Sequence, residues 1–284
     1  MSGVDAGRGL RSAGRLTAIA LAGLMLSSGP ARASCELRDA GEATVVEILN
    51  TESLLLEDGR AIRLIGALAP RTQTRWAETM DLKQTVITEL KERLLGAQVR
   101  LRFGGRERDR YGRLLTHVFV ESDDDPVWVQ EALIRDGLAM AYSFADNRAC
   151  LRRLLKAEAR AREHNAGLWK KGLFRVRDAA DPESMETLAY SFQIVEGRVK
   201  DVAVDRGRIY INFGEDWRTD VTATVDPSDR DNFADSDIRL RELEGRTVRV
   251  RGWLGRRNGP IIDVTHPEQI ELVAARDSAA PSAE

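Results

Sequence analysis

The chain has 284 residues, 43% of them hydrophobic and 31% charged, and its formal net charge is −2. This is the composition of an ordinary soluble globular protein, and the length suits two modest domains. The net charge excludes a protein that is held on nucleic acid by an overall positive charge. Arginines are nevertheless concentrated at 93–113 and 148–162, and acids at 123–125 and 226–237, a pattern that solvated surfaces also produce.

The first 33 residues have the features of a signal peptide. Arg8, Arg11 and Arg15 precede the apolar run LTAIALAGLML, which is too short to span a bilayer. Ala-Arg-Ala at 31–33 fits a cleavage site. We therefore expect residues 1–33 to be removed and the protein to be exported, either to the periplasm or out of the cell. No other run is long and apolar enough to predict a transmembrane helix.

The two cysteines, Cys35 and Cys150, form an even pair in a chain expected to reach an oxidising compartment. Their spacing matches no metal-binding motif. We expect a disulfide that ties the mature N-terminus to the start of a helix. The alternative is two separate thiols.

In the first half of the chain, β-branched and alternating runs predict strands, and helical periods predict helices. Asp58-Gly59 is typical of a hairpin turn. In the last of the expected helices, Glu158 interrupts a partial apolar stripe. The stripe consists of Leu151, Leu154, Leu155 and Ala161, and the face of the first helix consists of Leu82, Val86, Leu90 and Leu94. The expected strands are 43–49, 53–58, 61–66, 97–103 and 112–120, and the expected helices are 76–95, 127–137 and 148–169.

Residues 173–190 lose this periodicity and gain acids, which is typical of a linker. The strand pattern then restarts and includes one short helix, and the tail at 275–284 is expected to be disordered. The expected strands are 192–202, 208–213, 218–225, 246–254, 260–264 and 269–273, and the expected helix is 237–243.

Both halves show three strands, a helix and further strands, an order that fits a five-stranded OB-type barrel. The fold class expected is therefore β-rich α+β. An OB-fold barrel with helices at 40–172 is followed by a second, smaller OB-like β-barrel at 191–274.

Four stretches together resemble the staphylococcal nuclease (thermonuclease) family. They are RLIGALAP from Arg63, DRYGRLLTHVFV from Asp109, VQEALIRDGLAMAY from Val129 and AEARAREHNAGLW from Ala157. The resemblance covers about 40–172. The second half looks like the C-terminal OB-like module that is attached to some exported bacterial members.

The resemblance implies hydrolysis of DNA and RNA phosphodiesters with Ca²⁺. That chemistry needs a metal, a carboxylate that activates water and two arginines that hold the developing charge. Arg63 and Arg113 match the two family arginines and are the candidate catalytic residues. Tyr111 matches a family tyrosine, and Tyr142 falls near another that lines the nucleotide pocket. From the residues alone, Arg63 could be a surface residue on a strand, and Arg113 could pair with Asp109. Either tyrosine could equally be a packing residue at a domain edge.

The family carboxylates are mostly replaced. Leu68 stands where the family has an acidic metal ligand, Ala69 where it has a threonine, and Arg71 where it has the glutamate base. Glu52 is the one acid left near the site, and Ca²⁺ needs several oxygen ligands. Arg71 would repel a divalent cation and attract phosphate, so the implied Ca²⁺ site is expected to be weak or lost.

Three functions are compatible with these residues. The first is a binding protein for single-stranded DNA or RNA, or for another phosphodiester, with weak or absent hydrolysis. The second is an active metal-dependent endonuclease with rearranged ligands. The third is an interaction protein of the cell envelope. The oligomeric state stays open.

The second half contains aromatic and basic residues of the types that stack bases on OB surfaces. The alternative, which the acidic composition of this half favours, is that the tryptophans fill a small barrel and the arginines are solvated. The residues concerned are Tyr210, Trp217, Trp253, Arg256 and Arg257.

Overall fold

The computed structural model describes residues 35–70, 78–122 and 125–274. Chain contacts group Ala33–Glu284 as one unit. The expected signal peptide, the tail at 275–284 and Arg71 lie outside the described residues.

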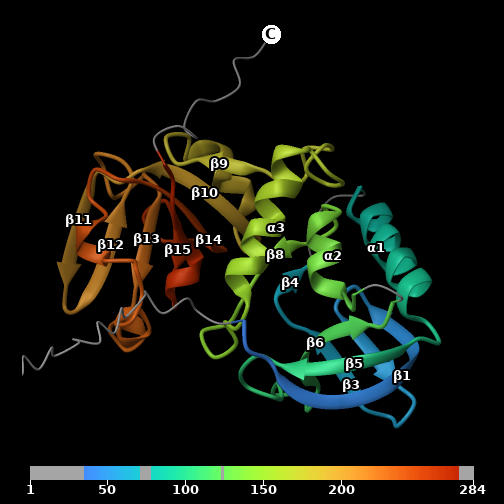
Figure 1. Ribbon diagram of the computed structural model, residues 1–284. Coiled ribbons are helices and arrows are strands. Elements are labelled where there is room, and N and C mark those ends of the chain that lie inside the picture. The colour runs from blue at the N-terminus through green and yellow to red at the C-terminus, as the bar shows by residue number, and fades with distance from the viewer. Residues whose placement is uncertain (1–34, 71–77, 123–124, 275–284) are drawn as a thin grey trace, which may run out of the picture. The chain divides into compact units, whose positions relative to one another are not determined.

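Five strands of the first half close into a barrel (Figure 1). Their order is β3-β2-β1-β5-β6, and a parallel pairing of β3 with β6 closes the ring. The expected barrel with helices and the β-rich α+β class are thereby confirmed. The barrel strands are β1 Arg38–Asn50, β2 Ser53–Leu56, β3 Ala61–Leu64, β5 Gln98–Phe103 and β6 Leu114–Val120, and β7 Val127–Trp128 extends the sheet.

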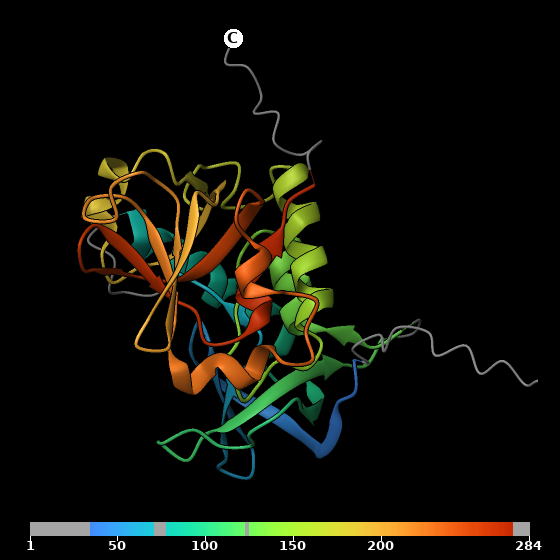
Figure 2. The ribbon, with the colours of Figure 1, turned by 90° about the vertical axis from the view of Figure 1, so that its left-hand side faces the viewer.

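Three helices belong to the first half: α1 Glu78–Leu94, α2 Val129–Arg135 and α3 Leu151–Glu163. Two short strands, β4 Ala67–Leu68 and β8 Met140–Ala141, pair with each other. Figure 2 shows the strands of the barrel, in blue and green, below α3. The apolar face predicted for α1 is confirmed, because all four of its leucine and valine side chains are buried: Leu82, Val86, Leu90 and Leu94.

The second half repeats the strand order of the first. β13, β12, the β11/β10 stretch, β14 and β15 follow one another, and β13 and β15 pair in parallel as β3 and β6 do. The strands are β9 Val176–Asp178, β10 Phe192–Arg198, β11 Asp201–Asp205, β12 Arg208–Asn212, β13 Thr222–Val225, β14 Thr247–Arg256, β15 Pro260–Asp263 and β16 Ile270–Leu272. The 3₁₀ helices are η1 Glu183–Leu188, η2 Pro227–Phe233, η3 Leu240–Glu242 and η4 Pro267–Gln269.

The structure differs from the expected elements where the chain changes partners. The run at 192–202 is two strands, because the Val199 amide bonds to Arg246 beside β14, while the Lys200 amide bonds to Asn212 of β12. This continuous stretch therefore pairs with β14 through β10 and with β12 through β11, which lie far apart in the order of strands. The segment expected to be a linker contains η1 and β9, which pairs in parallel with β10.

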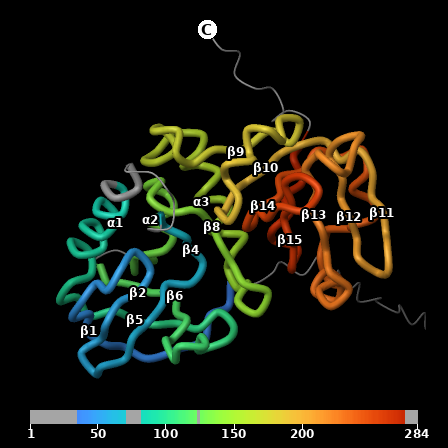
Figure 3. Tube along the Cα trace, turned by 180° about the vertical axis from the view of Figure 1, so that it is seen from behind, coloured from blue at the N-terminus to red at the C-terminus, as the bar shows by residue number. Residues whose placement is uncertain are grey.

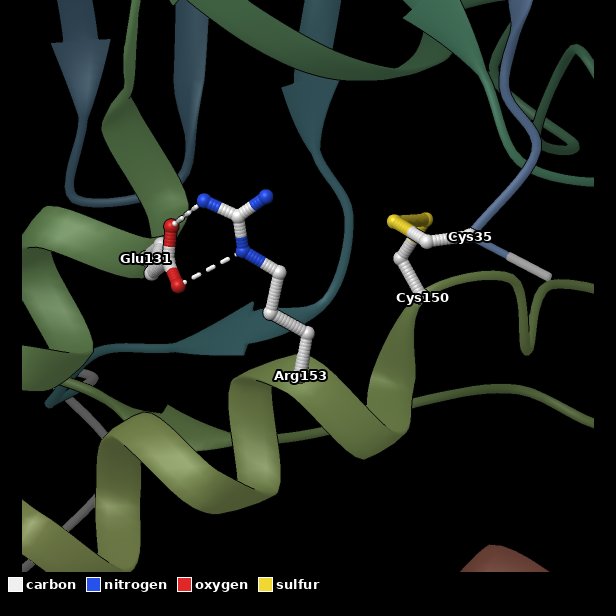
Figure 4. Close-up of a disulfide and its surroundings, with 4 residues drawn as sticks. All are labelled: Cys35, Glu131, Cys150 and Arg153. Atoms are coloured by element: carbon white, nitrogen blue, oxygen red, sulfur yellow. Dashed lines mark hydrogen bonds and ion pairs between the residues drawn. A yellow bond between two sulfur atoms is a disulfide. The ribbon is translucent and has the colours of Figure 1, made fainter. Parts of the chain in front are cut away.

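Cys35 and Cys150 form a disulfide across 115 residues of sequence. Figure 4 shows Cys35 on the segment that leads into β1 and Cys150 at the start of α3. One turn further along α3, Arg153 donates to Glu131 of α2, with 2.7 Å from Nε to Oε1. The disulfide and this ion pair both fix the first turn of α3.

A buried ion pair joins α3 to β14 of the second half, and Figure 3 shows α3 beside β10 and β14. The Arg251 guanidinium is 2% exposed and Glu158 is fully buried. Two parallel hydrogen bonds of 3.0 and 2.9 Å link them, and Arg251 also donates to Glu271. Burial alone would lower the pKa of Arg251, but Glu158 and Glu271 raise it above its ordinary value. Glu158, which interrupts the apolar stripe of α3, is therefore the partner of a buried charge.

Replacing Arg251 with Met should lower the free energy of unfolding by about 3–5 kcal/mol, because Glu158 would lose its buried counter-charge. Replacing Glu158 with Gln in the same chain should recover part of the loss. Urea unfolding of residues 34–284 measures both. Arg152→Met is the matched control, since the Arg152–Asp237 pair is exposed and should matter by less than about 1 kcal/mol. If Arg251→Met and Arg152→Met lowered the free energy of unfolding by the same amount, this account would be contradicted.

His266 is a second buried contact between the halves. Its Nε2 lies 2.6 Å from Oγ of Ser143, and its Nδ1 lies 2.9 Å from Oγ1 of Thr265. Burial, and then the nearby Arg148, lower the pKa of His266 to about 4. Burial alone lowers the pKa of His117, inside the barrel, to about 4 as well. Both side chains are thus held neutral in the folded protein.

Stability should fall as the pH drops from about 6.5 to about 4, because the unfolded chain binds protons there that the folded chain does not. The contribution is fully present above pH 6.5. His266→Asn should reduce the slope by about 1 kcal/mol per pH unit, even though it lowers stability at neutral pH. Urea unfolding at a series of pH values measures the slope, and an unchanged slope in the variant would show that His266 does not titrate in this window.

Candidate functional site

Three adjacent strands bring Arg63 and Arg113 together. Arg63 on β3 is the register partner of Ser53 on β2. On its other side Arg63 is the parallel partner of Leu115 on β6, and Arg113 immediately precedes that strand. Nη1 of Arg113 donates to Oγ of Ser53 across 2.9 Å. The two candidate arginines therefore meet around one serine.

Asp109 orients Arg113 from the turn before β6. Its Oδ2 lies 2.8 Å from Nε and 2.7 Å from Nη2 of Arg113, and its Oδ1 accepts from the amides of Tyr111 and Arg113. Burial would raise the pKa of Asp109, but these hydrogen bonds and the Arg113 charge lower it below its ordinary value. Arg113 therefore pairs with Asp109, the alternative that the sequence left open, and contacts Ser53 at the same time.

Arg63 lies between an acid and an aromatic ring. Its Nη2 is 3.4 Å from Oε2 of Glu52, and the two side chains are 15% and 10% exposed. Its guanidinium carbon is 5.1 Å from the ring centroid of Phe144, a cation–π geometry. Glu52 is therefore already in contact with a positive charge.

Of the two candidate tyrosines, Tyr111 lies beside Arg113, and Tyr142 contacts the ring that lies under Arg63. Tyr111 is 69% exposed, and the Arg113 guanidinium is 5.5 Å from its ring centroid. The Tyr142 ring meets Phe144 edge to face at 5.0 Å. Arg71 lies outside the described residues, but the residue before it, Pro70, accepts from Oγ1 of Thr51 at 3.4 Å. The end of the RLIGALAP stretch therefore contacts the turn that carries Glu52.

Leu68 and Ala69, which stand where the resemblance implies an acid and a threonine, are packed against apolar side chains. Leu68 and Ala69 are each 4% exposed. Leu68 pairs with Met140 in the β4–β8 sheet and lies in an apolar cluster with Leu82 and Trp169. Ala69 belongs to the core of the barrel.

The residues present do not fit Ca²⁺, which takes six to eight oxygen ligands. In the described part of the chain no group of three or more His, Cys, Asp or Glu side chains is placed to hold a metal ion. Asp58 supplies no ligand, because it bonds to Arg60 in the hairpin turn, at the opposite end of the β2–β3 hairpin from Glu52.

Two contributors to this arrangement escaped the sequence analysis. Nothing in the spacing indicates Ser53, because its role depends on Arg113, 60 residues away in sequence. Phe144 could have been found, since it follows Tyr142 by two residues and alternation would place both on one side of an extended segment.

The described residues of the first half thus form a five-stranded barrel with three helices, with Arg63 on one strand and Arg113 just before an adjacent strand. Residues 61–171 match the family described as "Staphylococcal nuclease homologue". The first half of the chain is therefore a domain of the staphylococcal nuclease family, as the motifs predicted. The match does not extend to the second half.

Known relatives agree with this assignment. The thermonuclease of Staphylococcus hyicus is 27% identical over 150 residues, which are 51% of this chain and 86% of that protein. Two proteins of Bacillus subtilis (strain 168), the SPbeta prophage-derived endonuclease YokF and the endonuclease YncB, are 35% and 34% identical over 83 residues. Those 83 residues are 28% of this chain and only 27% and 37% of the two endonucleases.

Leu68→Asp should lower the free energy of unfolding by about 3 kcal/mol or more, because it places a carboxylate among apolar side chains. Adding Ca²⁺ should not restore the melting temperature. Leu68→Asn is the uncharged control of the same size. Recovery of Leu68→Asp by Ca²⁺, without recovery of Leu68→Asn, would show that the metal geometry persists and needs only its ligand.

Proposed function

We propose that this chain is an exported protein of the thermonuclease family that binds nucleic acid or another phosphodiester, with hydrolysis weak or lost. One observation carries the proposal. Arg63 and Arg113 are held together around Ser53, while Leu68 and Ala69 are buried where ligand oxygens are needed. Guanidinium groups bind phosphate with a planar fork of donors and keep their charge at any physiological pH.

The protein's own groups supply binding and orientation. Asp109 and Ser53 fix the Arg113 guanidinium, and Glu52 and Phe144 fix that of Arg63. A phosphate bound beside Ser53 would meet both positive charges. Loss of a general base alone typically costs about 10²- to 10⁴-fold in rate. The absence of oxygen ligands at positions 68 and 69 adds to that loss.

The disulfide supports export. Disulfides persist in oxidising compartments and are rare in the cytosol, and Cys35–Cys150 is formed here. Together with the expected signal peptide, this supports a location in the periplasm or outside the cell. Among the described residues, no helix has the length and apolar character needed to cross a bilayer.

The second candidate is an active metal-dependent endonuclease. It is favoured by the names of the relatives, one a thermonuclease and two endonucleases. The third candidate, an envelope interaction protein, would use the same surfaces without a phosphate ligand. Salt separates it from the first, because phosphate contacts weaken steeply as salt rises.

Purified residues 34–284 should bind fluorescent single-stranded DNA and RNA in a salt-dependent way and leave them uncut with Ca²⁺, Mg²⁺ or Mn²⁺. Arg63→Ala with Arg113→Ala should weaken binding by at least about 10-fold, because charge-assisted hydrogen bonds are lost. Anisotropy and gel electrophoresis measure the two properties.

Each outcome assigns one candidate. Metal-dependent cleavage that EDTA stops and Arg113→Ala abolishes would establish the endonuclease, and cleavage that survives Arg113→Ala is contamination. Binding that is equal in the double variant would exclude these arginines as the site. Absence of nucleic-acid binding at low salt would leave the interaction protein.

A further inference from the structure

A continuous row of aromatic rings leads from Arg63 into the second half of the chain. Phe144 lies under the Arg63 guanidinium, and Tyr142 meets Phe144 at 5.0 Å. The Tyr142 ring then meets Phe192 of β10 at 5.4 Å, and Phe192 meets Trp253 of β14 at 5.9 Å. All three ring pairs are edge to face. Phe192 is buried, so it fixes Tyr142 on one side and Trp253 on the other.

Trp253, at the far end of this row, is 40% exposed, and Trp217 is 52% exposed. The expectation that the tryptophans fill a small barrel is therefore wrong for both. The reason lies in the register of β14. Val248, Val250 and Leu254 fill the core of the second half, so alternation directs Trp253 to the opposite face.

Tyr190 carries a second exposed ring, on the backbone segment that bonds to β14 one residue beyond Trp253. Its amide bonds to Leu254, the residue after Trp253, and the side chain is 85% exposed. Its φ of 65° lies in the left-handed region, where a bulky residue is a genuine outlier. Backbone strain of this kind concentrates at functional sites.

Arg256, at the end of β14, does not share this face. The alternation that directs Trp253 outward places Arg256 on the side of Leu254, where it is 64% exposed and lies 3.9 Å from Glu186. Exposed aromatic rings are themselves the groups on which unpaired bases stack. Sequence-independent binding of single strands relies on such rings because every base has a π face.

We infer that Trp253, with Tyr190, extends the phosphate-binding site into a track for a single nucleic-acid strand. The inference rests on the proposed function, because Arg63 and Arg113 hold the first phosphates. The strand then follows the ring row, and a base stacks on Trp253. The second half thereby favours longer single strands over short ones and over duplexes, whose bases are already stacked.

Anisotropy with a fluorescent thymidine trinucleotide and dodecanucleotide, in EDTA, tests this. Residues 34–284 should bind the dodecanucleotide more tightly than the trinucleotide. Trp253→Ala should weaken dodecanucleotide binding by roughly 5- to 150-fold, the loss of one stacked base, and leave trinucleotide binding unchanged. Trp253→Phe, which keeps a ring, should retain most of the affinity.

Trp217→Ala is the matched control. Trp217 is also exposed, but its ring contact is with its neighbour Arg218 at 4.6 Å, so dodecanucleotide binding should be unchanged. Circular dichroism and urea unfolding establish that each variant is folded. If Trp253→Ala fails to fold, Trp253→Phe and Tyr190→Ser replace it in the comparison. Tyr190→Ser should weaken binding of the dodecanucleotide and leave binding of the trinucleotide unchanged.

The outcomes separate this inference from the function on which it rests. Equal affinity for the two oligonucleotides, an equal effect of the Trp217 and Trp253 variants, or competition by a duplex as strong as by the single strand overturns the track. Trinucleotide binding that is lost in the Arg63 and Arg113 variants would still support the phosphate site. Absence of binding to both oligonucleotides overturns both proposals.

Discussion

The buried pair of Arg251 and Glu158 holds the candidate site as well as the two halves of the chain. Both side chains bond to the backbone of Ala141. Its amide donates to Glu158 at 2.7 Å, and its carbonyl accepts from Arg251 at 3.1 Å. Ala141 lies between Met140, the partner of Leu68, and Tyr142. One ion pair therefore fixes the segment that carries the ring row. Removing Glu158 would leave the buried Arg251 with Glu271, and removing Arg251 would leave the buried Glu158 with the more distant Arg162.

Under the proposed function, two arginines bind phosphate without the oxygen ligands that the family resemblance implies. The arginines are oriented by neighbours that do not depend on a metal: Ser53 and Asp109 for Arg113, Glu52 and Phe144 for Arg63. In contrast, Leu68 and Ala69 belong to the apolar packing of the first half. An acid at position 68 or 69 would destabilise this apolar packing.

The local elements could be predicted from the sequence because their causes are local. The spacing of Leu82, Val86, Leu90 and Leu94 defined the buried face of α1, and Asp58-Gly59 marked the hairpin turn. The matched motifs also indicated the arginines and the tyrosines near them. The features that the sequence did not predict depend on residues far apart in the chain. Glu158 looked like a flaw in an apolar stripe because its partner, Arg251, lies 93 residues further along the chain.

The same limit applies to the second half. Trp253 and Arg251 alternate with core residues on β14, and only the presence of α3 and Tyr142 on that side makes the outer face a second packing surface. Composition suggested instead that large apolar rings fill the nearest core. Period-two alternation was the better guide, but it could not show what covers the other face.

The position of the disulfide has a consequence for a protein that meets proteases. Every strand of the first barrel, together with α1 and α2, lies between Cys35 and Cys150. A single cut of the backbone anywhere in that stretch would produce two fragments that remain covalently joined. The severed ends would stay in reach of each other, so the barrel and its arginines could survive damage that would release half of an unlinked domain.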